Sequence, residues 1–300
     1  MTDFSAGQPG TLWVVATPIG NRGDLTERAR ALLETVPVLA VEDRRVSQRL
    51  LDHRQLPAQM IAVHEHSERR EVPRLLERLK SGEDVALLSD AGTPLVSDPG
   101  FRLVQAAHEH GVPVRPLPGP CAAVAALSVA GLPSDRFWFE GFLPARAEAR
   151  RHRLEALAAT PVTLILYVPA RDLVAVLDDC AATLGGQRAA SLARELTKLH
   201  ETVRRANLDE LAAFCRADSD QARGEAVLVI GGAEAEALSP VDPMALAREL
   251  AEALPPSRAA GVLARLTGLK RKQAWALIQQ QRNPDQPSAV EDGDALTRDG

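Results

Sequence analysis

The stretch that decides the fold is LLSDAGTPLVSDPG, residues 87–100, in which an aliphatic run gives way to two aspartates, two glycines and two prolines. The aliphatic residues at 85–89 predict a buried strand, and the glycines and prolines mark a turn after it. In parallel α/β sheets, ligands bind beyond the carboxyl ends of the strands. The stretch therefore predicts an α/β sheet with a ligand-binding loop at this strand end.

Two further loops have the same character: ATPIGNRGDL (16–25) follows the first predicted strand and PLPGPCAA (116–123) follows the fifth. Glycine lets a ligand approach the main chain, and proline fixes φ and removes a donor, so such loops are rigid and expose backbone groups. Any one of them would equally suit an ordinary turn. Three together favour a ligand that is read mainly through the backbone.

Apolar runs alternate with amphipathic patterns along the chain, which predicts an α/β fold with largely parallel sheets. Strands are expected at 12–16, 38–42, 60–64, 85–89, 112–117, 162–167, 189–195 and 226–231. Helices are expected at 24–36, with Asp24 or Thr26 as the cap, and at 70–82, 100–111 and 119–131. An arginine-rich helix follows within 132–161.

Composition shifts divide the chain into four predicted parts. They are an N-terminal α/β domain (11–119), a C-terminal α/β domain (120–233), a helical extension (243–283) of three short amphipathic helices, and a disordered polar tail (284–300). The small, acidic and proline residues at 231–243 indicate a linker.

Composition excludes several classes of protein. No run of eighteen apolar residues is present, and the start, MTDFSAGQPG, lacks a secretion-signal pattern, so we expect a cytoplasmic protein without membrane contact. Three widely spaced cysteines predict neither a disulfide framework nor a zinc site, and the histidine pairs 64/66 and 108/110 have no ligand partners at metal spacing. We predict no metal. The net charge of −5 argues against bulk nucleic-acid binding but leaves local basic patches open.

Standard nucleotide signatures are absent, since neither G-x-x-x-x-G-K-[ST] nor G-x-G-x-x-G occurs in the chain. A triphosphate ligand is therefore disfavoured. Pro120 is predicted at the first helical position of 119–131, which would turn the free N–H groups of that first turn towards a ligand carboxylate or ring nitrogen.

The motifs taken together resemble one family. TPIGN, SDAGTP, SDPG, PLPGPCAA, LPSDRF, EGFLP, ARELTK with Glu201 three residues later, and GEAVLVI look like the ribosomal RNA small subunit methyltransferase I family of the tetrapyrrole methylase superfamily, over residues 11–280. The resemblance implies transfer of a methyl group from S-adenosylmethionine to the ribose 2′-oxygen of a cytidine in 16S rRNA, in the decoding region of the small ribosomal subunit. It also implies two α/β domains with the donor cleft between them, and a homodimer.

The resemblance implies a set of donor-binding residues, of which Asp90 is the strongest because a carboxylate favours a sulfonium cation. The set is Ile19, Gly20, Asp90, Gly92, Thr93, Pro120, Cys121, Ala122, Tyr167, Leu196 and Ala226. A group is also needed to take the ribose proton. Candidates are Glu42, Asp43, Asp98, Glu195 and Lys198, of which we retain Asp98, Glu195 and Lys198 as catalytic. Alternatively, Asp98 caps the helix expected at 100–111 and takes no part in the chemistry.

Two departures from the family pattern affect this site. Arg44 replaces a threonine after the second strand, and YVPARD (167–172) stands where relatives have Y-E-x-x-H-R, so the usual glutamate and histidine are missing at Val168 and Arg171. RNA contacts are expected from basic patches at Arg44, Arg45, Arg150, Arg151, Lys270, Arg271 and Lys272. Two alternatives remain at this point: a methyltransferase for a small tetrapyrrole, and an RNA-binding assembly factor with a vestigial donor pocket.

Overall fold

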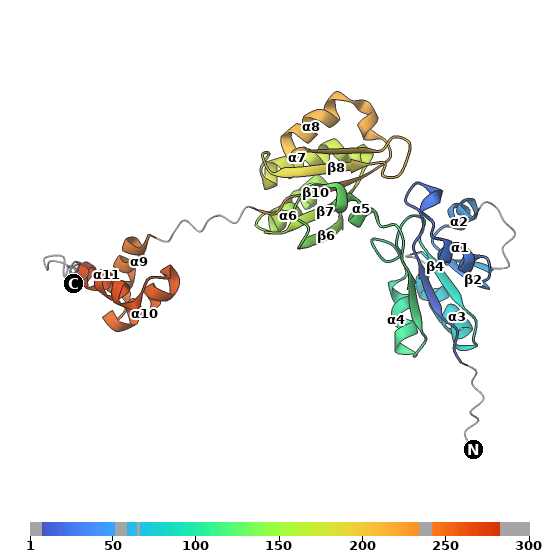
Figure 1. Ribbon diagram of the computed structural model, residues 1–300, viewed down its shortest axis with the longest axis horizontal. Coiled ribbons are helices and arrows are strands. Elements are labelled where there is room, and N and C mark those ends of the chain that lie inside the picture. The colour runs from blue at the N-terminus through green and yellow to red at the C-terminus, as the bar shows by residue number, and fades with distance from the viewer. Residues whose placement is uncertain (1–7, 52–58, 65–66, 234–241, 283–300) are drawn as a thin grey trace, which may run out of the picture. The chain divides into compact units, whose positions relative to one another are not determined.

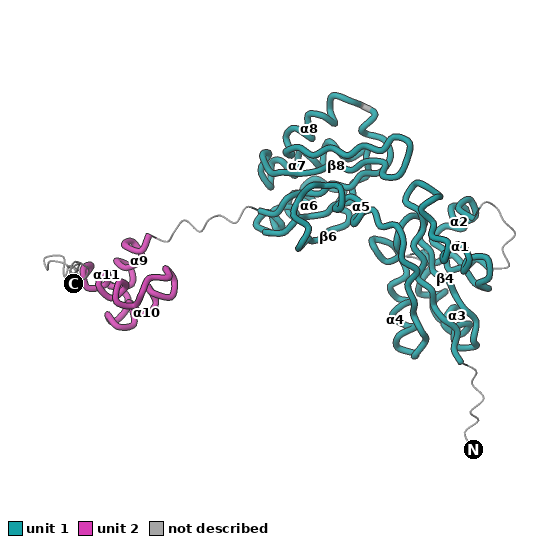
Figure 2. The backbone as a smooth tube through the Cα atoms, in the orientation of Figure 1, with its two compact units in different colours: residues 1–233 teal, residues 234–300 magenta. Residues whose placement is uncertain are grey.

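A computed structural model describes residues 8–51, 59–64, 67–233 and 242–282. The chain divides into two compact units, residues 1–233 and 234–300 (Figure 2). The predicted tail at 284–300, most of the predicted linker and His66 lie outside the described residues.

The first sheet of the larger unit is parallel throughout (Figure 1). It contains β1 (Leu12–Val15), β2 (Val38–Val41), β3 (Gln59–Ala62), β4 (Val85–Leu88) and β5 (Val114–Leu117), in the order β3-β2-β4-β1-β5. Every residue of β2 and β4 is buried, as expected for central strands covered on both faces. These strand ends bring the predicted loops to one edge of the sheet.

Helices cover both faces of this sheet, and the side chains of β2 alternate between them. They are α1 (Glu27–Leu33), α2 (Arg44–Leu50), α3 (Glu68–Lys80) and α4 (Phe101–Glu109), with a short 3₁₀ turn η1 (Arg22–Asp24) before α1. Val38 and Ala40 pack with α3 and α4, whereas Leu39 and Val41 pack with α1. Of the two predicted caps for α1, Thr26 is the correct one, because its hydroxyl accepts from the Ala29 amide.

The second sheet is mixed, with the order β6-β7-β10-β8-β9. Its strands are β6 (Phe137–Phe142), β7 (Thr163–Pro169), β8 (Ala189–Arg194), β9 (Thr202–Asn207) and β10 (Glu225–Ile230). One face packs on α5 (Ala122–Val129), and the other on α6 (Ala147–Leu157), α7 (Leu173–Leu184) and α8 (Leu208–Ala217). The 3₁₀ turns η2 (Ala170–Asp172) and η3 (Ser219–Ala222) precede α7 and β10. The predicted boundary at 119/120 falls between β5 and α5.

The second sheet corrects the prediction of largely parallel sheets. Only the β6–β7 pairing is parallel there, and the pairings of β7, β10, β8 and β9 are antiparallel. Sequence patterns also missed two strands, β6 and β9. Both are edge strands, and neither alternates cleanly: β6 carries a bulge, and β9 exposes Arg204 and Arg205.

The smaller unit confirms the three predicted C-terminal helices, α9 (Pro243–Ala253), α10 (Pro256–Thr267) and α11 (Arg271–Arg282). Its core is made of small and aliphatic side chains, including Ala247, Leu263, Ala274 and Ile278. Gly268 ends α10 in the left-handed conformation at φ 72°. Within the described parts of both units, no helix is long and apolar enough to cross a bilayer.

A buried ion pair joins α6 to α7. The Arg150 guanidinium lies 2.6 Å (Nη2) and 2.7 Å (Nε) from Oδ2 of Asp179, and both side chains are almost fully buried. Nη1 of Arg150 also donates to the Ala145 carbonyl at 3.2 Å. Removing one partner of such a pair leaves an uncompensated charge in the interior.

Asp179→Ala is therefore expected to lower the free energy of unfolding by about 3–5 kcal/mol, as measured by urea denaturation. Its neighbour Asp178 supplies the control, because Asp178 pairs with Arg216 at the surface and both are about half exposed. Asp178→Ala should cost at most about 1 kcal/mol. Equal costs for the two substitutions would show that the Arg150 pair is not desolvated.

Candidate functional site

A cavity of about 540 Å³ lies where strands of both sheets end. Its walls come from the loops after β1, β2 and β4 on one side, and from the ends of β6, β7 and β8 and the start of β10 on the other. The residues on the side of the first sheet are Ile19, Glu42, Asp90, Ala91, Gly92, Thr93, Val96, Ser97 and Asp98. The residues on the side of the second sheet, with Ala122 from the start of α5 (Ala122–Val129), are Ala122, Phe142, Tyr167, Val168, Pro169, Arg171, Ala193, Leu196, Lys198, Gly224, Glu225, Ala226 and Val227.

The loop after β4 is fixed to its neighbours by backbone and hydroxyl hydrogen bonds. Thr17 and Gly92 exchange N–H···O bonds of 2.8 and 3.1 Å, and the buried Thr17 hydroxyl lies 3.2 Å from the Ser89 carbonyl. The Thr93 hydroxyl donates to the Pro120 carbonyl at 2.9 Å. These bonds hold together the three glycine- and proline-containing loops that the sequence singled out.

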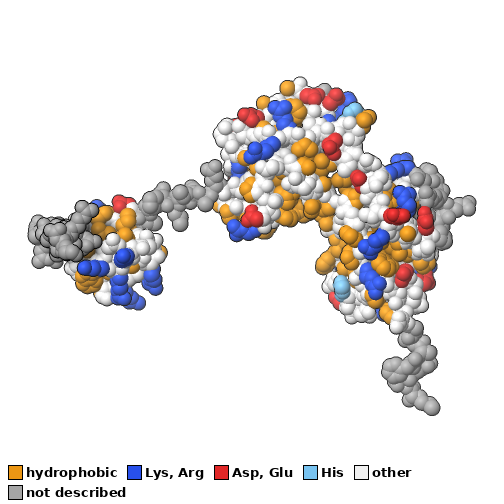
Figure 3. All heavy atoms as spheres, viewed as in Figure 1, with side chains coloured by type: hydrophobic (Ala, Val, Ile, Leu, Met, Phe, Trp, Pro, Cys, Tyr) orange, Lys and Arg blue, Asp and Glu red, His pale blue; other side chains and the backbone are white. Residues whose placement is uncertain are grey.

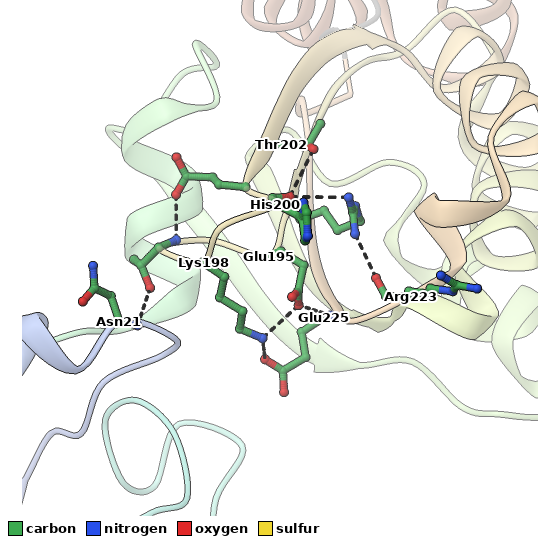
Figure 4. Close-up of polar contacts among 10 residues, drawn as sticks. Asn21, Glu195, Lys198, His200, Thr202, Arg223 and Glu225 are labelled. Carbon is green, nitrogen blue, oxygen red and sulfur yellow. Dashed lines mark hydrogen bonds and ion pairs between the residues drawn. The ribbon is translucent and has the colours of Figure 1, made fainter.

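The loop after β1 meets the loop after β8. The Asn21 amide donates to the Thr197 hydroxyl at 3.0 Å (Figure 4). A Cβ atom on Gly20 would lie 2.9 Å from the Thr197 hydroxyl and 3.0 Å from the Leu196 carbonyl. Only glycine therefore allows this approach, so Gly20 shapes the site without lining the cavity.

Strained backbone is concentrated in two loops of the site. In the described part of the chain, the non-glycine residues with positive φ are Leu95, Ser97, Glu195 and Thr197, with φ between 51° and 73°. Side chains in this left-handed region cost about 1–3 kcal/mol each and persist where the surroundings enforce them. Their grouping beside one cavity is typical of a functional site.

Three carboxylates give one wall of the cavity a negative character. Asp90 Oδ1 accepts from the Asp43 amide at 3.0 Å, and Glu42 Oε2 accepts from the Asp90 amide at 3.3 Å. Burial, with the charges of Glu42 and Asp43, raises the pKa of Asp90. Burial, with the charges of Glu42 and Asp90, raises the pKa of Asp98 to about 6, although a hydrogen bond with Ser89 opposes this shift.

Asp98 does not cap α4. The N-cap is Gly100, with φ 121°, and the first-turn amide of Arg102 donates to Glu68 Oε1 at 2.9 Å. A carboxylate two residues earlier lies at the cavity instead, so the cap alternative is wrong and Asp98 is free for the other predicted role.

Glu195 and Lys198 form an ion pair on the other side of the cavity (Figure 4). Lys198 Nζ lies 2.8 Å from Glu195 Oε1 and 3.0 Å from Glu225 Oε2. Burial opposes both charged forms, but the mutual hydrogen bonds outweigh it, lowering the pKa of Glu195 and raising that of Lys198. Lys198 thus stays protonated at neutral pH and has no lone pair to accept a proton, and Glu195, although ionised, is a weaker base than an ordinary glutamate.

Tyr167 lines the cavity and contacts the first turn of α5. Its hydroxyl accepts from the Ala123 amide at 3.2 Å, so one free N–H of the first turn is already satisfied. Burial raises the pKa of the Tyr167 phenol. The prediction that Pro120 is the first helical residue is wrong. α5 begins at Ala122 with Cys121 as its N-cap, so Pro120 precedes the helix.

Eight of the eleven predicted donor-binding residues line the cavity: Ile19, Asp90, Gly92, Thr93, Ala122, Tyr167, Leu196 and Ala226. Gly20, Pro120 and Cys121 do not, nor does the catalytic candidate Glu195, whereas Asp98 and Lys198 do. Sequence reasoning missed Phe142 and, on β10, Glu225 and Val227, although it named Ala226. A signal for Phe142 was present in EGFLP (140–144), where an aromatic residue ends the strand directly before Leu-Pro.

The predicted RNA-binding residues fall into two groups. Arg44 and Arg45 at the start of α2, and Lys270, Arg271 and Lys272 at the start of α11, are exposed. The prediction for Arg150 is wrong, because its guanidinium is buried against Asp179. Arg151 is half exposed, and its Nη1 lies 3.2 Å from Oδ1 of the same carboxylate. Figure 3 shows Lys and Arg side chains on the visible face of the smaller unit. In the described chain, no group of three His, Cys, Asp or Glu residues could hold a metal ion.

Comparison with known proteins assigns the family. The profile of the Tetrapyrrole (Corrin/Porphyrin) Methylases matches residues 11–212, and that of the RsmI C-terminal HTH domain matches residues 237–282. Ribosomal RNA small subunit methyltransferase I of Pseudomonas aeruginosa is 49% identical over 271 residues, covering 87% of this chain and 94% of the relative. That of Escherichia coli O157:H7 is 44% identical over 274 residues, covering 91% and 96%. The chain belongs to the ribosomal RNA small subunit methyltransferase I family.

Solved structures agree on the fold. Uroporphyrin-III C-methyl transferase of Thermus thermophilus, complexed with S-adenyl homocysteine, has a TM-score of 0.51 at 23% identity and covers 74% of this chain and 97% of that one. The methyltransferase CobJ has a TM-score of 0.56 at 21% identity, covering 75% and 95%. The expected tetrapyrrole methylase fold and the expected methyl donor, S-adenosylmethionine, are thereby confirmed.

The cavity fits this donor. Its volume lies within the range of about 300–1,000 Å³ that is usual for small-molecule sites. The donor carries a sulfonium and an ammonium, and carboxylates stabilise such cations at close range. Asp90 and Asp98, whose pKa values are raised by burial first and by neighbouring negative charge second, would hold the cationic part of the donor.

Asp98→Asn is expected to stabilise the folded protein at neutral pH. The folded-state pKa of about 6 lies above the ordinary aspartate value of 3.8, so the folded protein binds more protons than the unfolded chain between these pH values. Stability of the wild type therefore falls as the pH rises through this window, and the asparagine variant escapes that loss. Urea unfolding at about pH 4 and about pH 8 should show the gain at the higher pH alone.

A gain of equal size at both pH values would show that Asp98 has no raised pKa. The control for loss of a carboxylate is Asp220→Asn, at an exposed aspartate that pairs with Arg223 and does not line the cavity.

Proposed function

We propose that the chain transfers the methyl group of S-adenosylmethionine to the 2′-oxygen of a cytidine ribose in 16S rRNA, within the decoding region of the small ribosomal subunit. The observation that carries this proposal is the agreement, over about nine tenths of the chain, with relatives named ribosomal RNA small subunit methyltransferase I. The acidic cavity supports it, because a vestigial donor pocket would have no reason to retain strained loops and half-buried carboxylates.

Positioning supplies much of the rate in methyl transfer, since the attacking oxygen, the carbon and the sulfur must align. When bound, the donor supplies an electrophilic methyl group on a sulfonium. Asp90 holds the cationic donor, and the rigid loops after β1 and β4 exclude other orientations. Asp98 accepts the ribose proton, because its pKa of about 6 leaves it ionised at neutral pH while keeping it close to the pH of use.

RNA contact by the smaller unit is supported by the placement of its basic residues. Lys270, Arg271 and Lys272 stand at the N-terminus of α11, where positive charge is unfavourable to the helix dipole. Helix stability therefore does not account for them. In helix-turn-helix domains, the start of the second helix faces the nucleic acid, and α10 and α11 are joined by the short turn at Gly268.

The substrate is tested by incubating the protein with labelled donor and each of three acceptors: small ribosomal subunits lacking the modification, naked 16S rRNA, and a precorrin. We expect label on a cytidine ribose of the subunit or the rRNA, located by primer extension. Label on the precorrin alone would favour the alternative, a tetrapyrrole substrate. Donor binding by calorimetry without transfer to any acceptor would favour an assembly factor.

Replacing Lys270, Arg271 and Lys272 together with alanine should weaken binding to small subunits and reduce the salt slope of log K by about two to three, roughly one per lost phosphate contact. Donor affinity should be unchanged. Arg248→Ala and Arg258→Ala, which remove exposed charges from α9 and α10, are the controls for net charge. An unaltered salt slope in the triple variant would remove α11 from the RNA-binding surface. The homodimer and the cytoplasmic location stay predictions.

A further inference from the structure

Phe142 places an exposed aromatic ring at the cavity. It is the last residue of β6, its side chain is 57% exposed, and it lines the cavity beside Tyr167. The two rings meet edge-on, with centroids 5.5 Å apart. The far face of the Phe142 ring is thus left to solvent at a site that binds a substrate.

A backbone irregularity produces this position. In a regular strand, residues 139 and 142 would point to opposite faces of the sheet. The register shifts between Phe139 and Gly141, so Phe142 pairs with Tyr167 and shares a face with Phe139, whose ring also contacts Tyr167 at 5.0 Å. Bulges next to active sites commonly re-aim a side chain in this way.

Gly141 locks the bulge against the acidic loop. Its φ is 72°, and a Cβ atom there would lie 2.8 Å from the Ser97 hydroxyl. The position thus requires glycine both for its backbone conformation and for the close approach. Because Ser97 directly precedes Asp98, the ring of Phe142 is fixed relative to the proposed proton acceptor.

Arg171 provides a cation on the same rim. It follows β7, the strand paired in parallel with β6, and its side chain is 81% exposed. Its nearest described charge partner is the neighbouring Asp172, at 3.6 Å. The other cavity-lining cation, Lys198, is already held between Glu195 and Glu225.

We propose that Phe142 and Arg171 form the nucleotide-binding rim of the cavity, with Phe142 stacking on an unstacked RNA base and Arg171 pairing with a backbone phosphate. The inference rests on the proposed function and names the residues that would seat its substrate. Proteins recognise exposed RNA bases chiefly by stacking on aromatic rings, which works for any base because each has a π-face. A phosphate beside Glu42, Asp90 and Asp98 needs a cation, and Arg171 is the exposed one on the described cavity wall.

The test measures equilibrium binding of small ribosomal subunits with S-adenosylhomocysteine present, so that turnover is not required. Phe142→Ala and Phe142→Leu should weaken binding by about 5- to 100-fold, the range expected for one lost stacking contact. Phe142→Tyr should retain wild-type binding, which separates stacking from loss of fold. Arg171→Ala should weaken binding and lower the salt slope by about one, whereas Arg171→Lys should keep most of the slope.

Matched controls lie outside the cavity. Phe137→Leu alters another exposed phenylalanine of β6, and Arg136→Ala alters an exposed arginine that, like Arg171, lies beside a neighbouring aspartate, at 3.7 Å. Neither should change subunit binding. Equal effects of Phe137→Leu and Phe142→Leu would overturn the proposal, as would Phe142 variants that lose only donor affinity or only self-association in sedimentation.

The two proposals fail in different ways. Wild-type protein that binds subunits but leaves rRNA unlabelled contradicts the proposed function. Wild-type protein that labels rRNA while the Phe142 and Arg171 variants bind subunits normally contradicts the rim alone.

Discussion

The contact at Gly20, between a loop from each sheet, is the constraint on which the site depends. A side chain at this position would collide with the Leu196 carbonyl and the Thr197 hydroxyl, and the Asn21 amide bonds to that same hydroxyl. The loops that follow β1 and β8 are therefore in direct contact. Residues from both sheets line one cavity beside this contact, so they can act on one ligand.

Order in the two strained loops must be enforced from outside them. Arg194, at the end of β8, is buried and donates to the Gln221 side chain and to the carbonyls of Arg223 and His200. Glu201 accepts from the Thr197 amide at 2.6 Å. These bonds anchor both flanks of the segment that contains Glu195 and Thr197, and they offset the cost of positive φ. Local strain is thus maintained by charge-assisted bonds a few residues away.

Sequence patterns located the site because its chemistry is encoded locally. Glycine and proline after aliphatic strands marked the loops that contain Asp90 and Thr93, and most residues expected to bind the donor line the cavity. What failed depends on pairing between distant residues. The local sequence around Arg150 suggests a surface charge, but Arg150 forms a buried ion pair with Asp179 on another helix. Phe142 reaches the cavity through a bulge, and β9 is an edge strand too polar for alternation to show it. Local periodicity reports neither feature.

Charge sets opposite requirements for the two ligands of such a site. In the proposed function, Asp90 and Asp98 favour a cationic donor, and the same carboxylates repel the phosphates of a nucleic acid. Loss of the methyl group turns a sulfonium into a neutral thioether, so the acidic wall holds the spent donor less strongly than the fresh one. The polyanion must instead be bound by cations outside that wall, and exposed residues such as Arg171 and the start of α11 satisfy this condition. A net charge of −5 is therefore compatible with an RNA substrate, because local placement of charge decides which ligand each surface attracts.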